Sequence, residues 1–157
     1  MLALTACAGL APAAEPYLRL CHTRTEYAEV STALAASSPM ALLRGELNEL
    51  MLDCQVTGWD GYGAEAVSIE AYAAAQRFIR SLPAGFPTPE LAADPDGCVN
   101  FDWHVSPRRT LVVSVHPDFR LDFAALIGTA KIYGSEPFFA SELPASVRDL
   151  VRRVCPV

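Results

Sequence analysis

The chain has 157 residues, of which 52% are apolar and 19% are charged, and its formal net charge is −6. This length and apolar content suffice to bury one sizeable core, which argues against disorder of the whole chain. The negative charge argues against a nucleic-acid backbone as the main partner, because phosphate binding needs clustered Lys and Arg side chains. An acidic surface instead suits a basic protein partner.

The N-terminal segment, residues 1–16, is expected to be flexible and carries no charge before Glu15. Leu4-Thr5-Ala6-Cys7 resembles the cleavage box of bacterial lipoproteins, although no basic residue precedes it. If Cys7 belongs to a truncated signal, the protein is a lipoprotein, and this is the alternative location. No apolar run reaches the roughly 18 residues that a membrane-spanning helix needs.

The cysteines follow no metal-binding or disulfide pattern. Their spacing is irregular and no C-x-x-C pair occurs among them: Cys7, Cys21, Cys54, Cys98 and Cys155. Such spacing indicates reduced thiols, which are typical of cytoplasmic proteins. We therefore expect a cytoplasmic protein without a cofactor or a bound metal.

Residues 17–157 are expected to form a single α+β domain that begins with a helical part, 17–57. A helix over Pro16–Ser37 is followed by a second helix, with Ser38 as its N-cap and Pro39 in its first turn. An apolar stripe at helical spacing marks the core-facing side of this second helix: Leu43, Leu47, Leu50, Met51 and Cys54.

A glycine-rich loop, 58–67, follows the helical part. Its first seven residues, G-W-D-G-Y-G-A, contain three glycines, two aromatic residues and one carboxylate. We expect Gly61 and Gly63 to adopt positive φ, which permits a tight path. Trp59 and Tyr62 are then expected to fold back as anchors of the loop.

Asp60 is expected to accept hydrogen bonds from neighbouring backbone amides, which would make the loop structural. The alternative is a small-molecule site that includes Trp59, Asp60 and Tyr62, because free amides at a helix N-terminus attract an anion. The glycine spacing, however, matches neither common phosphate-binding motif.

The remaining part, 68–157, is predicted to be a helix, a meander and a final helix. Ser68 is expected to cap a helix over Ile69–Leu82. The hydrophobic period then changes from 3.6 to 2, which predicts an antiparallel meander of four to five strands. Its segments of alternating polarity are 91–93, 99–105, 111–115, 121–125 and 131–133. Helices, including one over Pro144–Val154, are expected to pack on its one apolar face.

Matching the apolar faces predicts the strand register, because a slip of one residue would invert them. Trp103 is placed beside Val113 and Phe123. Phe101 is placed beside Val115 and Leu121.

The same register gathers polar side chains on the opposite face of the sheet. One row holds Asp102, Ser114 and Asp122, the next holds Asn100, His116 and Arg120, and His104 lies two residues from Asp102. Cross-strand neighbours stand about 5 Å apart, so these side chains are within reach of one another. We interpret this face, or the Trp59 loop, as the binding surface for a partner protein.

The alternative for this face is a hydrolase or a metal-binding protein. Asp102, His104, Ser114 and His116 supply the residue types of nucleophilic catalysis, and the carboxylates and imidazoles suit several metals. A flat exposed sheet, however, lacks the water-excluding cleft that catalysis needs. The motifs G-x-S-x-G and H-E-x-x-H are also absent from the sequence.

Three features follow one another in a recognisable order. They are the motif W-D-G-Y-G-A at Trp59–Ala64, the predicted helix after it, and Asp96-Gly97 leading to Phe101-Asp102-Trp103. In this order they resemble a set of small, uncharacterised bacterial proteins with a W-D-G-x-G-A loop. The resemblance covers roughly Trp59–Val154 and implies that this stretch is one folding unit. It implies no activity, so the expected function rests on charge and size: a non-catalytic protein-binding module, such as an acidic accessory or inhibitor subunit of the antitoxin or immunity type.

Overall fold

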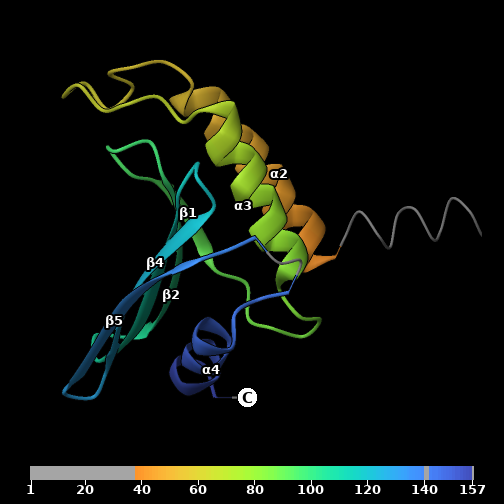
Figure 1. The fold of residues 1–157 in the computed structure, drawn as a ribbon, viewed down its shortest axis with the longest axis vertical. Coiled ribbons are helices and arrows are strands. Elements are labelled where there is room, and N and C mark those ends of the chain that lie inside the picture. The colour runs from red at the N-terminus through yellow and green to blue at the C-terminus, as the bar shows by residue number, and fades with distance from the viewer. Residues whose placement is uncertain (1–37, 140–141, 157) are drawn as a thin grey trace, which may run out of the picture. The chain divides into compact units, whose positions relative to one another are not determined.

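The computed structural model describes residues 38–139 and 142–156. Pro39–Val157 forms one compact unit. The predicted helix over Pro16–Ser37, the boundary after residue 16 and the cleavage box at Cys7 lie outside the described residues. The described part has an α+β fold, with three helices and a five-stranded antiparallel sheet (Figure 1).

Two of the three described helices begin at the predicted residue, and the last begins one residue later than predicted. Their bounds are α2 (Pro39–Cys54), α3 (Ile69–Ser81) and α4 (Ala145–Val154). The hydroxyl of Ser68 accepts a hydrogen bond from the amide of Ala71 at 3.2 Å, so Ser68 caps α3 as predicted. Pro144 occupies the N-cap of α4, where its missing N–H costs nothing. Among the described helices, none has the length and apolar content needed to cross a bilayer.

The sheet is a meander in which neighbours in sequence are neighbours in space. Its strands are β1 (Glu90–Ala93), β2 (Val99–Ser106), β3 (Arg109–Val115), β4 (Arg120–Ile127) and β5 (Ala130–Pro137). The order across the sheet is β1-β2-β3-β4-β5, and every pair is antiparallel. The predicted meander is therefore confirmed, with β1 and β5 as its two edges.

The core lies between the apolar face of the sheet and the helices, which lie on one side of it (Figure 1). Phe78 of α3 is fully buried, and its ring centroid lies 4.5 Å from that of Phe101 and 5.9 Å from that of Phe138. The helix α4 packs on β3 and β4, and α2 packs against α3 and along β1. One face of the sheet is thus closed, and the other, which we call the open face, carries the polar side chains.

The register between β2 and β3 differs from the prediction by two residues. Trp103 pairs with Leu111 instead of Val113, and Phe101 pairs with Val113 instead of Val115. The predicted register between β3 and β4 is confirmed. Because the shift is an even number, every apolar side chain of the two strands that was expected in the core still faces it, with one exception at Val105.

A tight turn and a bulge cause this difference. Ser106 pairs with Arg109, so that only Pro107–Arg108 forms the turn, and the pairing then shifts at Val105. The side chain of Val105 is 52% exposed, although the alternation predicted it in the core. Without the extra residue, so short a turn would set the apolar residues of β2 against polar residues of β3. The bulge restores the common apolar face.

A substitution at the close contact between Gly134 and Phe123 tests the packing of β5 on β4. The two residues are cross-strand partners, and a Cβ on Gly134 would lie 2.6 Å from Cζ of the phenyl ring. We expect Gly134→Ala to lower the free energy of unfolding by about 1–3 kcal/mol, because the ring must move. Gly45→Ala in α2 is the matched control, since nothing lies within 4 Å of its added Cβ. It should raise stability by about 0.5–1 kcal/mol in the same urea titration; equal effects of the two changes would contradict this packing.

Candidate functional site

The glycine-rich loop is held together by its own side chains. One carboxylate oxygen of Asp60 accepts hydrogen bonds from the amides of Ala64 at 3.0 Å and Tyr62 at 2.8 Å. These two bonds hold the pKa of Asp60 below its ordinary value. The indole N–H of Trp59 donates to the carbonyl oxygen of Glu65 at 3.0 Å. The structural role predicted for Asp60 and Trp59 is therefore confirmed.

The loop is not organised as an anion site. Gly61 and Gly63 have φ of 79° and 97°, as predicted. The side chain of Tyr62 is 96% exposed, so the expectation that it anchors the loop is wrong. The hydrogen bond that the amide of Tyr62 donates to Asp60 fixes the backbone at this position without help from the phenol ring. The same carboxylate occupies two of the amides that an anion would need, which removes support from the small-molecule alternative.

The loop braces the turn between β1 and β2. The amide of Glu65 donates to the carbonyl oxygen of Pro95 at 2.8 Å. Gly97 has φ of 83°, and a Cβ there would lie 3.0 Å from the carbonyl oxygen of Ala66. A residue other than glycine is therefore strained twice at this position, by its backbone conformation and by the contact.

On the open face, the corrected register changes the predicted rows. Asn100 pairs with Ser114, which pairs with Asp122, so these three form one row. Asp102 pairs with Val112 and is separated from the two residues with which it was expected to align. The predicted row of Asp102, Ser114 and Asp122 is therefore wrong, because a bulge set the register.

The set of residues proposed for hydrolysis is dispersed in the structure. His104 is exposed and pairs with Thr110. Ser114 lies one row away from both Asp102 and His116, and it has neither of them as its cross-strand partner. A serine nucleophile with a neighbouring histidine base is thus not assembled on this face.

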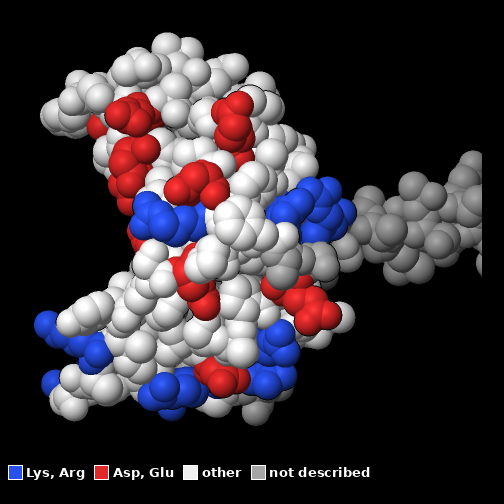
Figure 2. All heavy atoms as spheres, viewed as in Figure 1, with Lys and Arg blue, Asp and Glu red and all other residues white. Residues whose placement is uncertain are grey.

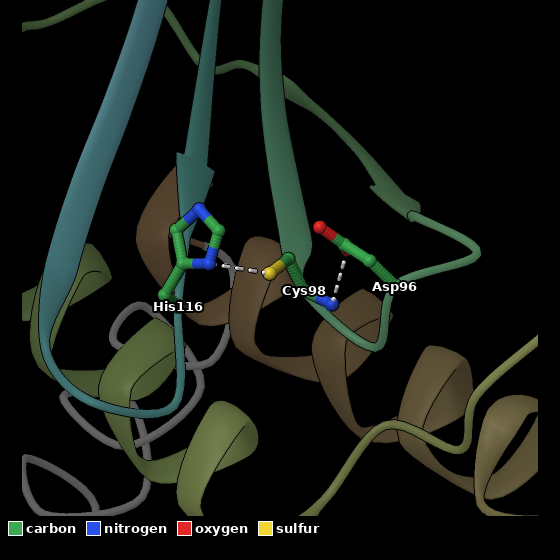
Figure 3. Close-up of side chains that lie close together, drawn as sticks. All are labelled: Asp96, Cys98 and His116. Atoms are coloured by element: carbon green, nitrogen blue, oxygen red, sulfur yellow. Dashed lines mark hydrogen bonds between the residues drawn. The ribbon is translucent and has the colours of Figure 1, made fainter. Parts of the chain in front are cut away.

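A different cluster forms where β2 begins and β3 ends. Cys98 stands opposite His116, and its Sγ lies 2.9 Å from His116 Nδ1 (Figure 3). A carboxylate oxygen of Asp96 accepts a hydrogen bond from the backbone amide of Cys98 at 3.0 Å. The register prediction had placed Asn100 opposite His116, and it missed both Cys98 and Asp96. Only the correct register could have found them, because no spacing motif joins these residues.

The far side of His116 is held by an ion-pair network. Its Nε2 lies 2.9 Å from Oδ2 of Asp122. Arg120 donates from Nη1 to both carboxylate oxygens of Asp122, at 2.7 and 2.5 Å, and its Nη2 lies 3.0 Å from Nδ1 of His116. Three of the predicted site residues, His116, Arg120 and Asp122, are therefore brought together.

Surrounding charges set the pKa values in this cluster. Burial alone would raise the pKa of Asp122, but hydrogen bonds from Ser135 and Arg120 and nearby positive charge outweigh it, so the pKa is lowered. Burial, a hydrogen bond to Asp96 and the charges of Asp96 and Asp94 raise the pKa of Cys98 to about 12. The thiol is therefore protonated at neutral pH, and it lacks the thiolate that a nucleophile needs.

A separate groove of about 660 Å³ runs between α2 and β1. Its carboxylates come from both elements: Glu46, Glu49, Asp53 and Glu90. Apolar side chains also line it, among them Leu50, Trp59 and Leu91. No Lys or Arg is among the described residues that line it. We call this feature the acidic groove.

Comparison with known proteins identified no relative of this chain. No protein-family model matches the chain, and no match was found among curated proteins or solved structures. The resemblance at Trp59–Ala64 remains a prediction. The described geometry and charges are therefore the basis for assigning a function.

Asp102 gives a test of the electrostatics on the open face. Its Oδ1 is buried and has no hydrogen-bond partner within the described structure. Burial raises the pKa of Asp102, His104 lowers it and Glu90 raises it, with a net increase. A carboxyl group whose pKa is raised by folding reduces stability once it is ionised, and this cost disappears as the pH falls below its unfolded pKa.

Asp102→Asn should therefore raise the melting temperature by a few degrees at pH 7. The gain should shrink as the pH is lowered toward 3, because the wild-type carboxyl group then becomes neutral as well. Thermal unfolding by circular dichroism across this range measures the effect. A variant that is less stable than the wild type at pH 7 would contradict this account.

Proposed function

We propose that this protein is a non-catalytic binding module that holds a basic, extended segment of a partner protein in the acidic groove. The observation that carries the proposal is the set of four carboxylates along the groove, with no Lys or Arg among its described lining residues. Such a surface attracts a positively charged segment and disfavours an acidic one. The role that fits is an accessory or inhibitor subunit, as in antitoxin or immunity proteins.

The edge strand β1 supports an extended conformation for the bound segment. All four of its residues, Glu90–Ala93, line the acidic groove. β1 pairs with β2 on one side, and no described strand pairs with its other side. An added strand can therefore hydrogen-bond to its outer backbone groups, which is a common mode of peptide recognition.

The other wall and the apolar side chains of the groove supply further contacts. Glu49 and Asp53 lie on α2, four residues apart, so they face the same side of that helix. Leu50, Trp59 and Leu91 offer apolar surface between the carboxylates. Lys and Arg side chains suit such a surface, because their alkyl stems pack on apolar groups while their charged ends reach carboxylates.

Charge is unevenly spread on the described part of the chain. On the face seen in Figure 2, Asp and Glu side chains predominate over the upper part of the view, where α2 and α3 extend. Lys and Arg side chains predominate along the lower edge, near α4. This separation supports oriented approach of a basic partner toward the helical pair.

We propose that the protein acts in the cytoplasm. Cys54, Cys98 and Cys155 are free, and no disulfide joins cysteines in the described part of the chain. Unpaired thiols are typical of a reducing compartment. The competing placement of the partner is the open face around Asp102, Ser114, His116 and Arg120, which is the surface predicted from the sequence.

Selection of peptides tests the proposal. Random 12-residue peptides displayed on phage are selected on the purified protein, and the enriched peptides are synthesised for titration. We expect enrichment of Lys and Arg at alternate positions. Glu49→Lys should weaken binding about tenfold, because one favourable charge pair becomes unfavourable. Glu142→Lys changes the net charge equally at an exposed position outside the groove and should have less than a twofold effect.

Hydrogen exchange locates the bound peptide. A strand added to β1 should slow exchange of amides within Glu90–Ala93. Protection on the open face instead, equal weakening by the two charge reversals, or enrichment of peptides without basic residues would overturn the proposal.

A further inference from the structure

Three side chains with metal-binding atoms meet beside the turn between β1 and β2. Asp96, Cys98 and His116 each direct one such atom toward the others, and these atoms all lie within 4.8 Å of one another (Figure 3). Asp96 comes from the turn, Cys98 directly precedes β2, and His116 directly follows β3. The register of the sheet therefore brings His116 to Cys98, which lies 18 residues earlier in the sequence.

We propose that Asp96, Cys98 and His116 bind one zinc ion and leave a fourth position for water or for a ligand from another molecule. Thiolate, imidazole and carboxylate are the three ligand types that zinc uses in proteins. Three protein ligands with one open position is also a common zinc coordination. This inference does not depend on the peptide-binding proposal.

The distances in the cluster are close to those that zinc requires. With Zn–S of about 2.3 Å and Zn–N of about 2.0 Å, a sulfur and a nitrogen in tetrahedral coordination stand about 3.5 Å apart. Cys98 Sγ and His116 Nδ1 are 2.9 Å apart. They need to separate by only about half an ångström, which small side-chain rotations provide.

The environment of His116 resembles that of a metal-binding histidine. Its Nε2 lies 2.9 Å from a carboxylate oxygen of Asp122. When this nitrogen donates its proton to the carboxylate, Nδ1 carries the lone pair and points toward Cys98. Histidine ligands commonly bond a carboxylate through their second nitrogen, which fixes the ring orientation and raises its basicity.

Electrostatics near the thiol favour a cation. The amide of Cys98 donates to the carboxylate of Asp96, and the amide of Asp94 donates to the carbonyl oxygen of Cys98, so both acidic residues lie near the thiol. Their negative charge attracts a metal ion. On binding, the thiol proton of Cys98 is released to solvent and the sulfur bonds to zinc as thiolate. Arg120 opposes binding, because its Nη2 lies 3.0 Å from His116 Nδ1. Its charge is partly balanced by the carboxylate of Asp122.

Exposure allows entry from one side. Cys98 is buried, His116 is half-buried and Asp96 is exposed. An ion therefore has access from the side of Asp96, where its fourth ligand can also come from solvent.

Titration with Zn²⁺ and Co²⁺ after chelator treatment tests the site on the full chain. We expect one ion per chain, and visible Co²⁺ absorption with a sulfur-to-metal charge-transfer band. Cys98→Ser should abolish that band, and both Cys98→Ser and His116→Asn should weaken Zn²⁺ binding at least about tenfold. Cys155→Ser is the matched control, because it removes a thiol outside the cluster, and it should leave affinity unchanged.

Two further variants separate direct ligands from supporting residues. Asp122→Asn should weaken Zn²⁺ binding about tenfold while the charge-transfer band persists. Arg120→Gln should strengthen binding, because it removes the opposing charge. A wild-type protein without the charge-transfer band, or a folded Cys98→Ser protein with unchanged affinity, would overturn the proposal. If Cys98→Ser fails to fold, unchanged Co²⁺ spectra and Zn²⁺ affinity in His116→Asn would overturn it equally.

Discussion

The register between β2 and β3 is the constraint on which the rest of the structure depends. A two-residue turn at Pro107–Arg108 and one extra residue at Val105 fix it. With this register, Phe101 meets Val113 on the closed face and lies under Phe78 of α3. On the open face it sets Cys98 against His116. A register differing by two residues would preserve the apolar face but would separate the thiol of Cys98 from the imidazole of His116. The fold would therefore tolerate such a shift, whereas the cluster would be lost.

The turn between β1 and β2 connects the two proposed sites. β1 forms one wall of the acidic groove, and the turn after it supplies Asp96 and leads to Cys98. The glycine-rich loop holds this turn through the bond from Glu65 to Pro95. Trp59 belongs to both features, since it donates a hydrogen bond inside the loop and lines the groove. The loop thus acts as a brace that positions the groove and the cluster, and its glycines serve that geometry.

Local features of the fold were predictable because their causes are local. Ser68 caps α3 by a bond three residues away, and Gly61 and Gly63 adopt the positive φ that their spacing suggested. The register of β3 with β4 also followed from alternation alone. The bulge at Val105 was not predictable, because a valine in an alternating segment is the normal sign of a core position. The wrong register also affected the predicted site. It included His116, Arg120 and Asp122, but it missed Cys98 and Asp96.

The pairing of Cys98 with His116 is the central claim, because the proposed zinc site depends on it. Backbone nuclear Overhauser effects of the isotopically labelled protein measure it directly, since cross-strand partners in an antiparallel sheet bring their protons close together. We predict contacts that join Cys98 to His116 and Phe101 to Val113. Contacts that join Asn100 to His116 and Phe101 to Val115 would show the register predicted from the sequence instead, and would contradict this pairing.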